Sequence, residues 1–238
     1  MQWQSPIPSS FTTLQTDPPT QLAIGVRSGI DKHVVTEMVQ AIRAVDWDTL
    51  VHAYGPATDV ADQLIAAAVG DERTREAAWW NLWGNIHHQG TIYESTVPAA
   101  PIIARLAGWS SYPDRVEAIC FLREIASADG VVVWRGDEDE LVHDDERQKS
   151  LAADLNGDVR NRAIALLDNW RGEPPEVRRA LLWLLGGLPE LQERFSDLVE
   201  AELPPEYTHA WTLLQRGPGS QEEFDRICEL EEWALARP

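Results

Sequence analysis

The segment 87–94 contains four residues that could support proton transfer: His87, His88, Tyr93 and Glu94. A histidine can act as a general base near neutral pH, and a nearby carboxylate or phenol can orient it or act as the acid. In this interpretation His87, His88 and Glu94 are catalytic residues. The alternative is structural, because polar groups around the turn 87–91 can satisfy the N–H and C=O groups of flanking helix ends. We favour the structural interpretation and predict no catalytic residue.

An acidic run at residues 137–146 is the second group with possible chemistry, because carboxylates are suitable ligands for calcium or magnesium. Its spacing does not match a calcium-binding loop, since Leu141 and His143 interrupt the alternating acids and no glycine occupies the sharp turn. The chain also has no Gly-rich phosphate loop, nucleophile elbow or HExxH motif. We therefore predict no metal site and no cofactor, and interpret the run as a solvated loop.

Tryptophan is unusually frequent, with 11 residues in the chain. In the helix predicted at 71–86, Trp80, Trp83 and His87 follow one another at i, i+3 and i+7, beside the predicted core stripe. Large aromatic side chains are usually core residues, but tryptophan and tyrosine also dominate the hot spots of protein interfaces. The predicted binding residues are Trp80, Trp83, His87, Tyr93, Trp134, Arg135, Asp137, Glu138, Asp139 and Glu140.

The formal net charge is −19, and residues 136–238 carry 11 basic and 24 acidic side chains. Nucleic acids and anionic membranes both require a positive surface, so we predict neither as a partner. An acidic excess of this size acts as a solubilising surface, or as a docking face for a basic protein.

A chain of 238 residues can bury a sizeable core, as one large domain or two small ones. It contains no run of about 18 apolar residues and no signal-peptide pattern at its N-terminus. Cys120 and Cys228 each fall in an amphipathic helical pattern, which favours reduced, buried thiols. These features predict a cytoplasmic protein.

Helical periodicity begins near residue 31 and continues almost to the C-terminus. Residues 1–30 contain four prolines and no sustained period, so we predict an extended or disordered arm. A short helix is expected at 46–53. Residues 128–148 interrupt the helical pattern as an acidic insertion with strand propensity at 131–134.

Two later segments, 158–167 and 176–185, align without gaps and predict two helices that bury the same apolar stripe. Short helices separated by brief Gly/Pro turns are typical of stacked helical hairpins. The predicted fold is therefore all-α, with about ten helices in residues 31–238.

The segment 173–186, an acidic-Pro turn followed by Val-Arg and a Leu-rich run, resembles the second-helix motif of HEAT repeats. Residues 71–84 form a weaker copy, in which Arg75 occupies the place of Arg178. The section 84–101, which contains His-Gln-Gly-Thr followed by Tyr and Glu, is similar to bacterial HEAT-repeat-like proteins, mostly of unknown function. This resemblance spans roughly residues 45–190 and implies a HEAT-like α-solenoid.

The leading functional prediction is a non-enzymatic protein-binding module that recognises a basic protein partner, such as an immunity protein that neutralises a toxin. The alternatives are an enzyme or tailoring protein that uses the cluster at 87–94, and a scaffold in a biosynthetic pathway.

Overall fold

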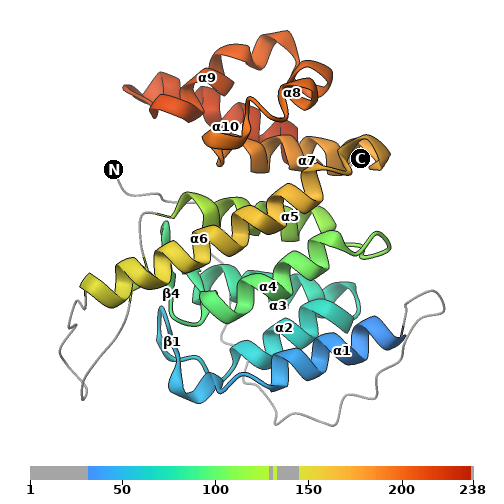
Figure 1. Ribbon diagram of the computed structural model, residues 1–238, viewed down its shortest axis with the longest axis vertical. Coiled ribbons are helices and arrows are strands. Elements are labelled where there is room, and N and C mark those ends of the chain that lie inside the picture. Colours follow the sequence, from blue (N-terminus) through green and yellow to red (C-terminus); the bar gives the residue numbers. More distant parts are fainter. Residues whose placement is uncertain (1–31, 129–130, 133–144, 237–238) are drawn as a thin grey trace.

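The computed structural model describes residues 32–128, 131–132 and 145–236, and helices dominate this part of the chain (Figure 1). The prediction of an all-α protein with about ten helices is confirmed for these residues. The predicted arm, residues 1–30, lies outside them. The α-helices are α1 Lys32–Arg43, α2 Val60–Val69, α3 Glu72–Asn85, α4 Thr96–Gly108, α5 Arg115–Ser127, α6 Asp145–Leu167, α7 Pro175–Gly186, α8 Ser196–Glu202, α9 Thr208–Arg216 and α10 Gln221–Leu235.

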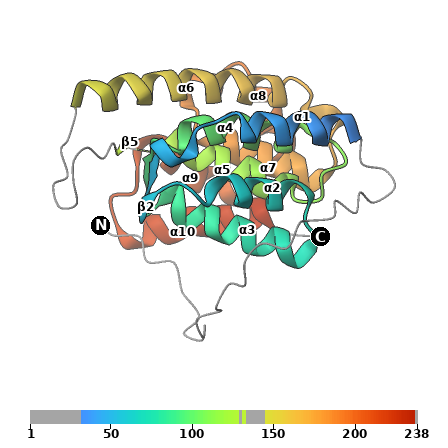
Figure 2. The ribbon, with the colours of Figure 1, turned by 90° about the horizontal axis from the view of Figure 1, so that it is seen from below.

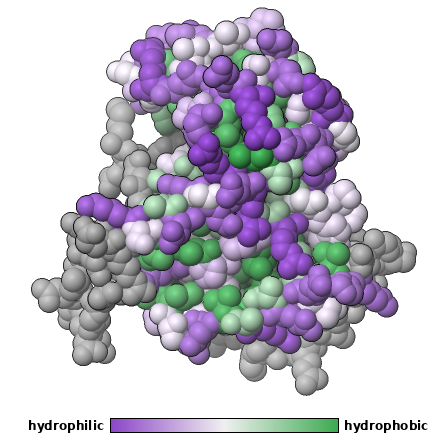
Figure 3. Space-filling model, in the orientation of Figure 1, coloured by the Kyte–Doolittle hydropathy of each residue, from purple (hydrophilic) through white to green (hydrophobic). Residues whose placement is uncertain are grey.

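The described helices pack as successive pairs. Helix α2 packs on α3 and α4 packs on α5, while α4 also contacts α6 and α5 also contacts α7. Helix α7 in turn contacts α10, which packs on α9. Figure 2 shows α6 along one side of the molecule and α3 and α10 along the other, with α5 and α7 between these layers. The surface in Figure 3 is largely polar, with separate apolar areas between the polar ones.

The core runs through these layers without interruption. Trp183 of α7 and Phe121 of α5 are among the largest fully buried side chains, together with Leu82 of α3. Burial of such side chains is the main source of folding free energy. Among the described helices, none combines the length and the apolar character needed to cross a bilayer.

The short helix predicted at 46–53 is wrong. Residues Trp47–Thr49 form a single 3₁₀ turn, and the chain then makes a hairpin of strands β1 (Val51–His52) and β2 (Gly55–Pro56). The Trp47 indole is buried and donates a hydrogen bond of 2.8 Å to the carbonyl of Ile42, which ends the helical path. Gly55, at φ 127°, supplies a backbone conformation that residues with side chains rarely adopt.

The polar turn after α3 is also a hairpin. Strand β3 (His87–His88) pairs antiparallel with β4 (Thr91–Tyr93), through the two-residue loop Gln89-Gly90. Both loop residues have positive φ, 50° and 82°, as a type I′ turn requires. Strand β5 (Val131–Val132), from the predicted insertion, pairs parallel with β4. The insertion ends earlier than predicted, because α6 already begins at Asp145.

We expect Gly90→Ala to destabilise the protein by about 1 kcal/mol, because a side chain at positive φ strains the backbone. Gly84→Ala is the matched control, since an added Cβ at this position in α3 meets no atom within 4 Å. In a helix, alanine is favoured over glycine by about 1 kcal/mol. Chemical denaturation should therefore show that the free energy of unfolding falls in Gly90→Ala and rises in Gly84→Ala. Equal changes in the two variants would contradict the assignment of the turn.

Candidate binding groove

The aromatic residues and the histidine of the predicted binding surface differ in their exposure in the structure. Trp80 is exposed, with 65% of its surface accessible, whereas Trp83 is half-buried and His87 and Tyr93 are buried. The Trp83 ring packs on Phe121 with ring centroids 4.3 Å apart. Helix α5 therefore covers the face on which Trp83 and His87 were expected to be exposed. The other predicted binding residues, Trp134, Arg135, Asp137, Glu138, Asp139 and Glu140, lie outside the described residues.

The two histidines of the hairpin occupy different surroundings. The His87 ring lies edge-on to Trp83 and Phe121, at centroid distances of 5.4 and 6.1 Å. Burial lowers the pKa of His87, so its imidazole is neutral at pH 7, and Nε2 has no hydrogen-bond partner among the described residues. The His88 ring instead faces the exposed ring of Tyr54, 5.4 Å away. Glu94 is buried at the end of the hairpin.

A polar network joins the first hairpin to α2 and α3. The backbone N–H of Tyr54 donates to Nδ1 of His52, so the other ring nitrogen, Nε2, carries the proton donated to Asp59 at 3.0 Å. Asp59 also accepts hydrogen bonds from Gln63 and Asn85. Both nitrogens of His52 are thus engaged, which gives this histidine a structural role rather than that of a free base.

A groove of about 510 Å³ lies between α3, α5 and the end of α10, beside the first turn of α7. Apolar side chains from all three main helices line it, and carboxylates surround them. The apolar members are Trp83, Pro113, Val116, Cys120, Leu235 and Ala236, and the charged members are Glu72, Arg75, Asp114, Glu117, Glu124, Glu176 and Glu231.

The groove is strongly acidic, with six carboxylates and one guanidinium in its lining. That guanidinium, Arg75, is already paired with Asp114 at 2.6 Å. Glu72, Glu117 and Glu176 belong to the first turns of α3, α5 and α7, where a negative charge favours the helix dipole. An acid in the first turn stabilises each of these helices separately. Because all three first turns border the groove, the same acids also make the groove negatively charged.

Trp83 forms part of the groove wall. Its indole N–H donates a hydrogen bond of 2.6 Å to Glu117, which fixes the ring against Phe121. Trp80 lies three residues earlier on the same helix, which makes the two residues neighbours on the helix surface. The groove thus combines an anchored aromatic wall with an exposed tryptophan beside it, and both are features of protein-binding surfaces.

The lining of the groove also contains the thiol of Cys120 and the neighbouring carboxyl groups of Glu124 and Glu231. Cys120 is buried, and burial raises its pKa well above the ordinary value, so it stays a neutral thiol rather than a nucleophile. Burial, together with the charge of Glu124, raises the pKa of Glu231 to about 7. Neither cysteine forms a disulfide in the structure.

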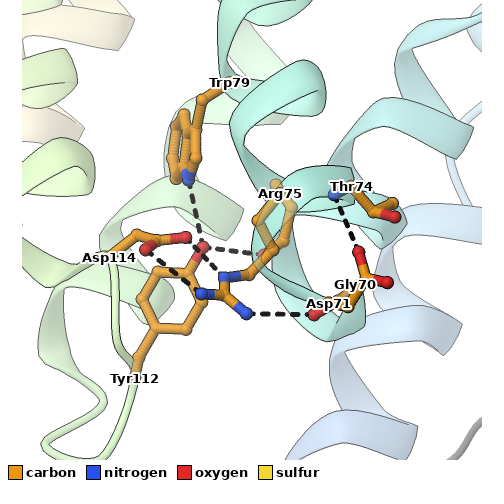
Figure 4. Close-up of polar contacts among 8 residues, drawn as sticks. Gly70, Asp71, Thr74, Arg75, Trp79, Tyr112 and Asp114 are labelled. Atoms are coloured by element: carbon orange, nitrogen blue, oxygen red, sulfur yellow. Dashed lines mark hydrogen bonds and ion pairs between the residues drawn. The ribbon is translucent and has the colours of Figure 1, made fainter.

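The ion pair of Arg75 and Asp114 belongs to a buried network (Figure 4). Arg75 also donates to the carbonyl of Gly70 at 3.1 Å. The hydroxyl of Tyr112 accepts a hydrogen bond of 3.1 Å from Trp79 and donates one of 2.7 Å to a carbonyl of α2. This network joins α2 and α3 to the start of α5.

The contacts of Arg75, with a carboxylate and with a backbone carbonyl, recur at other arginines along the chain. Arg178 of α7 donates to the carbonyl five residues before it, as Arg75 does, and pairs with Glu202 at 2.6 Å. Arg115 of α5 forms a two-pronged pair with Glu173, at 2.5 and 2.8 Å, and its presence lowers the pKa of Glu173. In each case the carboxylate comes from a later segment of the chain. The equivalence of Arg75 and Arg178 therefore extends from sequence to contacts.

The two copies differ at the position of Trp183, which corresponds to Trp80 in the first copy. Trp183 is buried, with 2% of its surface accessible, and the guanidinium of Arg123 lies 4.2 Å from its ring. Trp80, at the equivalent place, is exposed. A second groove, between α2 and α3, contains no aromatic side chain and mixes Arg73 with acids.

Comparisons with family models, curated proteins and solved structures gave no match to this chain. The carboxylates of the groove were not predicted from the sequence, although acids at the starts of successive helices were a usable signal. Among the described residues, no group of three or more His, Cys, Asp or Glu side chains could hold a metal ion.

Proposed function

We propose that the chain is a non-enzymatic protein-binding module that docks a basic segment of a partner protein in the groove between α3, α5 and α10. The observation that carries this proposal is the lining of the groove, in which six carboxylates surround an apolar floor and an anchored tryptophan. Complementary charge steers a partner and fixes its orientation, while apolar and aromatic contacts slow its dissociation.

We also propose that the described helices are a HEAT-like α-solenoid. Three features support this proposal: the stacking of α4 on α6, the stacking of α5 on α7, and the recurring arginine contacts. In such an array each helical pair buries its apolar face against its neighbours, and the inner helices offer a continuous surface to a partner.

A narrower proposal is an immunity protein that acts in the cytoplasm and neutralises a cationic toxin, such as a nuclease. Its support is the net charge of −19 together with the acidic groove. An enzyme centred on His87, His88 and Glu94 receives no comparable support, because His87 packs between aromatic rings and His88 faces Tyr54. Nothing specific favours a biosynthetic scaffold.

Photo-crosslinking tests where a basic segment docks. The probe is a nona-arginine peptide that carries a benzophenone at its N-terminus, and mass spectrometry locates the adducts. We expect adducts on the groove-lining parts of α3, α5 and α10, including Trp83 and Leu235. Adducts confined to the acidic run 137–146 would place docking on the insertion instead and would overturn the proposed use of the groove.

A further inference from the structure

We propose that Glu231 is the proton-linked contact of the groove, so that a cationic side chain docking there displaces the proton of this carboxyl group. The inference rests on the proposed function and specifies how it is regulated. It makes binding of a basic partner stronger above neutral pH and weaker below it. The relevant geometry is the position of Glu231 on α10, at the wall of the groove that faces α5.

Glu231 is placed among charges of its own sign. Glu124 of α5 and Glu231 of α10 line the same groove, and Glu232 follows on the same helix. The charge of Arg123 acts to lower the pKa of Glu231, but the Arg123 guanidinium already pairs with Glu124 and lies over the Trp183 ring. Glu231 has no ion pair or side-chain hydrogen bond with another described residue. A docked cation would therefore supply the counter-charge that this carboxylate does not have.

Every element that borders the groove carries charged or titratable groups. They are Glu72 and Arg75 on α3, Asp114 just before α5, Glu117, Cys120, Arg123 and Glu124 on α5, Glu176 and Arg179 on α7, and Cys228 and Glu232 on α10. Burial raises the pKa of both thiols above 9, so they keep their protons near neutral pH. Burial lowers the pKa of His87, which acts electrostatically on Glu124, so this imidazole is neutral at pH 7.

The sign of the pH effect follows from these positions. In the free protein, burial and neighbouring charge raise the pKa of Glu231 to about 7, so close to half of the molecules carry its proton at pH 7. A cation in the groove stabilises the carboxylate and lowers this pKa. Binding at pH 7 therefore releases about half a proton, and affinity rises by up to about tenfold between pH 6 and pH 8.

Isothermal titration calorimetry with N-acetylated nona-arginine tests this inference, because with its α-amino group blocked the peptide has no group that titrates between pH 6 and pH 8. Titrations at pH 7 in phosphate and in Tris, whose ionisation enthalpies differ, give the number of protons released. We expect proton release and the pH dependence of Kd in the wild-type protein, and neither in Glu231→Gln. Glu229→Gln, the same charge change at an exposed position of α10, is the matched control and should behave as the wild type.

The outcomes separate this inference from the proposed function. If nona-arginine binds in the groove but Glu231→Gln releases as many protons as the wild type, the role of Glu231 is wrong and the docking groove remains. If the peptide fails to bind at pH 8, or its photo-adducts lie outside the groove, the proposed function fails and this inference fails with it.

Discussion

Asp114→Ala is expected to lower the free energy of unfolding by up to about 3 kcal/mol, because removal of one partner of a largely buried ion pair leaves the other charge without compensation. Both side chains are well covered, with 13% of Arg75 and 22% of Asp114 accessible. The remaining guanidinium would still contact the carbonyl of Gly70 but would lose its only carboxylate partner among the described residues. Chemical denaturation measured by circular dichroism gives the change.

Two comparisons make this prediction specific. Glu222→Ala removes the carboxylate of an exposed pair with Arg226 in the first turn of α10 and should lower the free energy of unfolding by no more than about 1 kcal/mol. The double variant Arg75→Met/Asp114→Ala should recover part of the loss, since it leaves no buried charge. Equal effects of Asp114→Ala and Glu222→Ala would show that the buried network does not join α3 to α5 as described.

The all-α fold class was predictable because the spacing of apolar residues indicates which face of each helix is buried. Helix α3 shows this clearly, since it was predicted at 71–86 and spans Glu72–Asn85, directly after Asp71, whose side chain accepts a hydrogen bond from the N–H of Thr74. The equivalence of Arg75 and Arg178 was also visible, because similar local contacts select similar residues at similar spacing. In both cases the determinants are local in sequence.

Of the short strands, only β5 lies in a segment that was given strand propensity, and neither hairpin was predicted. Residues 46–53 carry a plausible helix start, but burial of the Trp47 indole and the conformation of Gly55 turn the chain into a hairpin. Residues 87–91 were predicted as a turn, which the β3–β4 hairpin contains, and β4 also pairs with β5, more than 35 residues later in the chain. Pairing over such distances leaves only a weak local signal.

The groove could not be predicted from one helix alone. Periodicity placed Trp83 and His87 beside a core stripe, and it did not reveal that Phe121 would cover both. Likewise, the acids of α3, α5 and α10 are separated by many residues in sequence. Only the packing of these helices brings Glu72, Glu117 and Glu231 around one space.

Reversal of two groove charges, in the variant Glu72→Lys/Glu176→Lys, is expected to weaken binding of nona-arginine by at least about 30-fold. The reason is that cations facing a cationic ligand cost several kcal/mol. Both residues lie in first turns of helices, so each change also removes a favourable dipole interaction of up to about 1 kcal/mol. Thermal unfolding should confirm that the variant is folded at the temperature of the titration.

The comparison with Glu193→Lys/Glu200→Lys tests the central claim most directly. These two glutamates are exposed, lie outside the groove, and give a variant of the same net charge. Calorimetric Kd values for nona-arginine should be at least about tenfold weaker for the groove pair than for this control pair, because close charges act more strongly than distant, screened ones. Equal weakening of the two variants would show that binding follows total charge and would contradict a docking site in the groove.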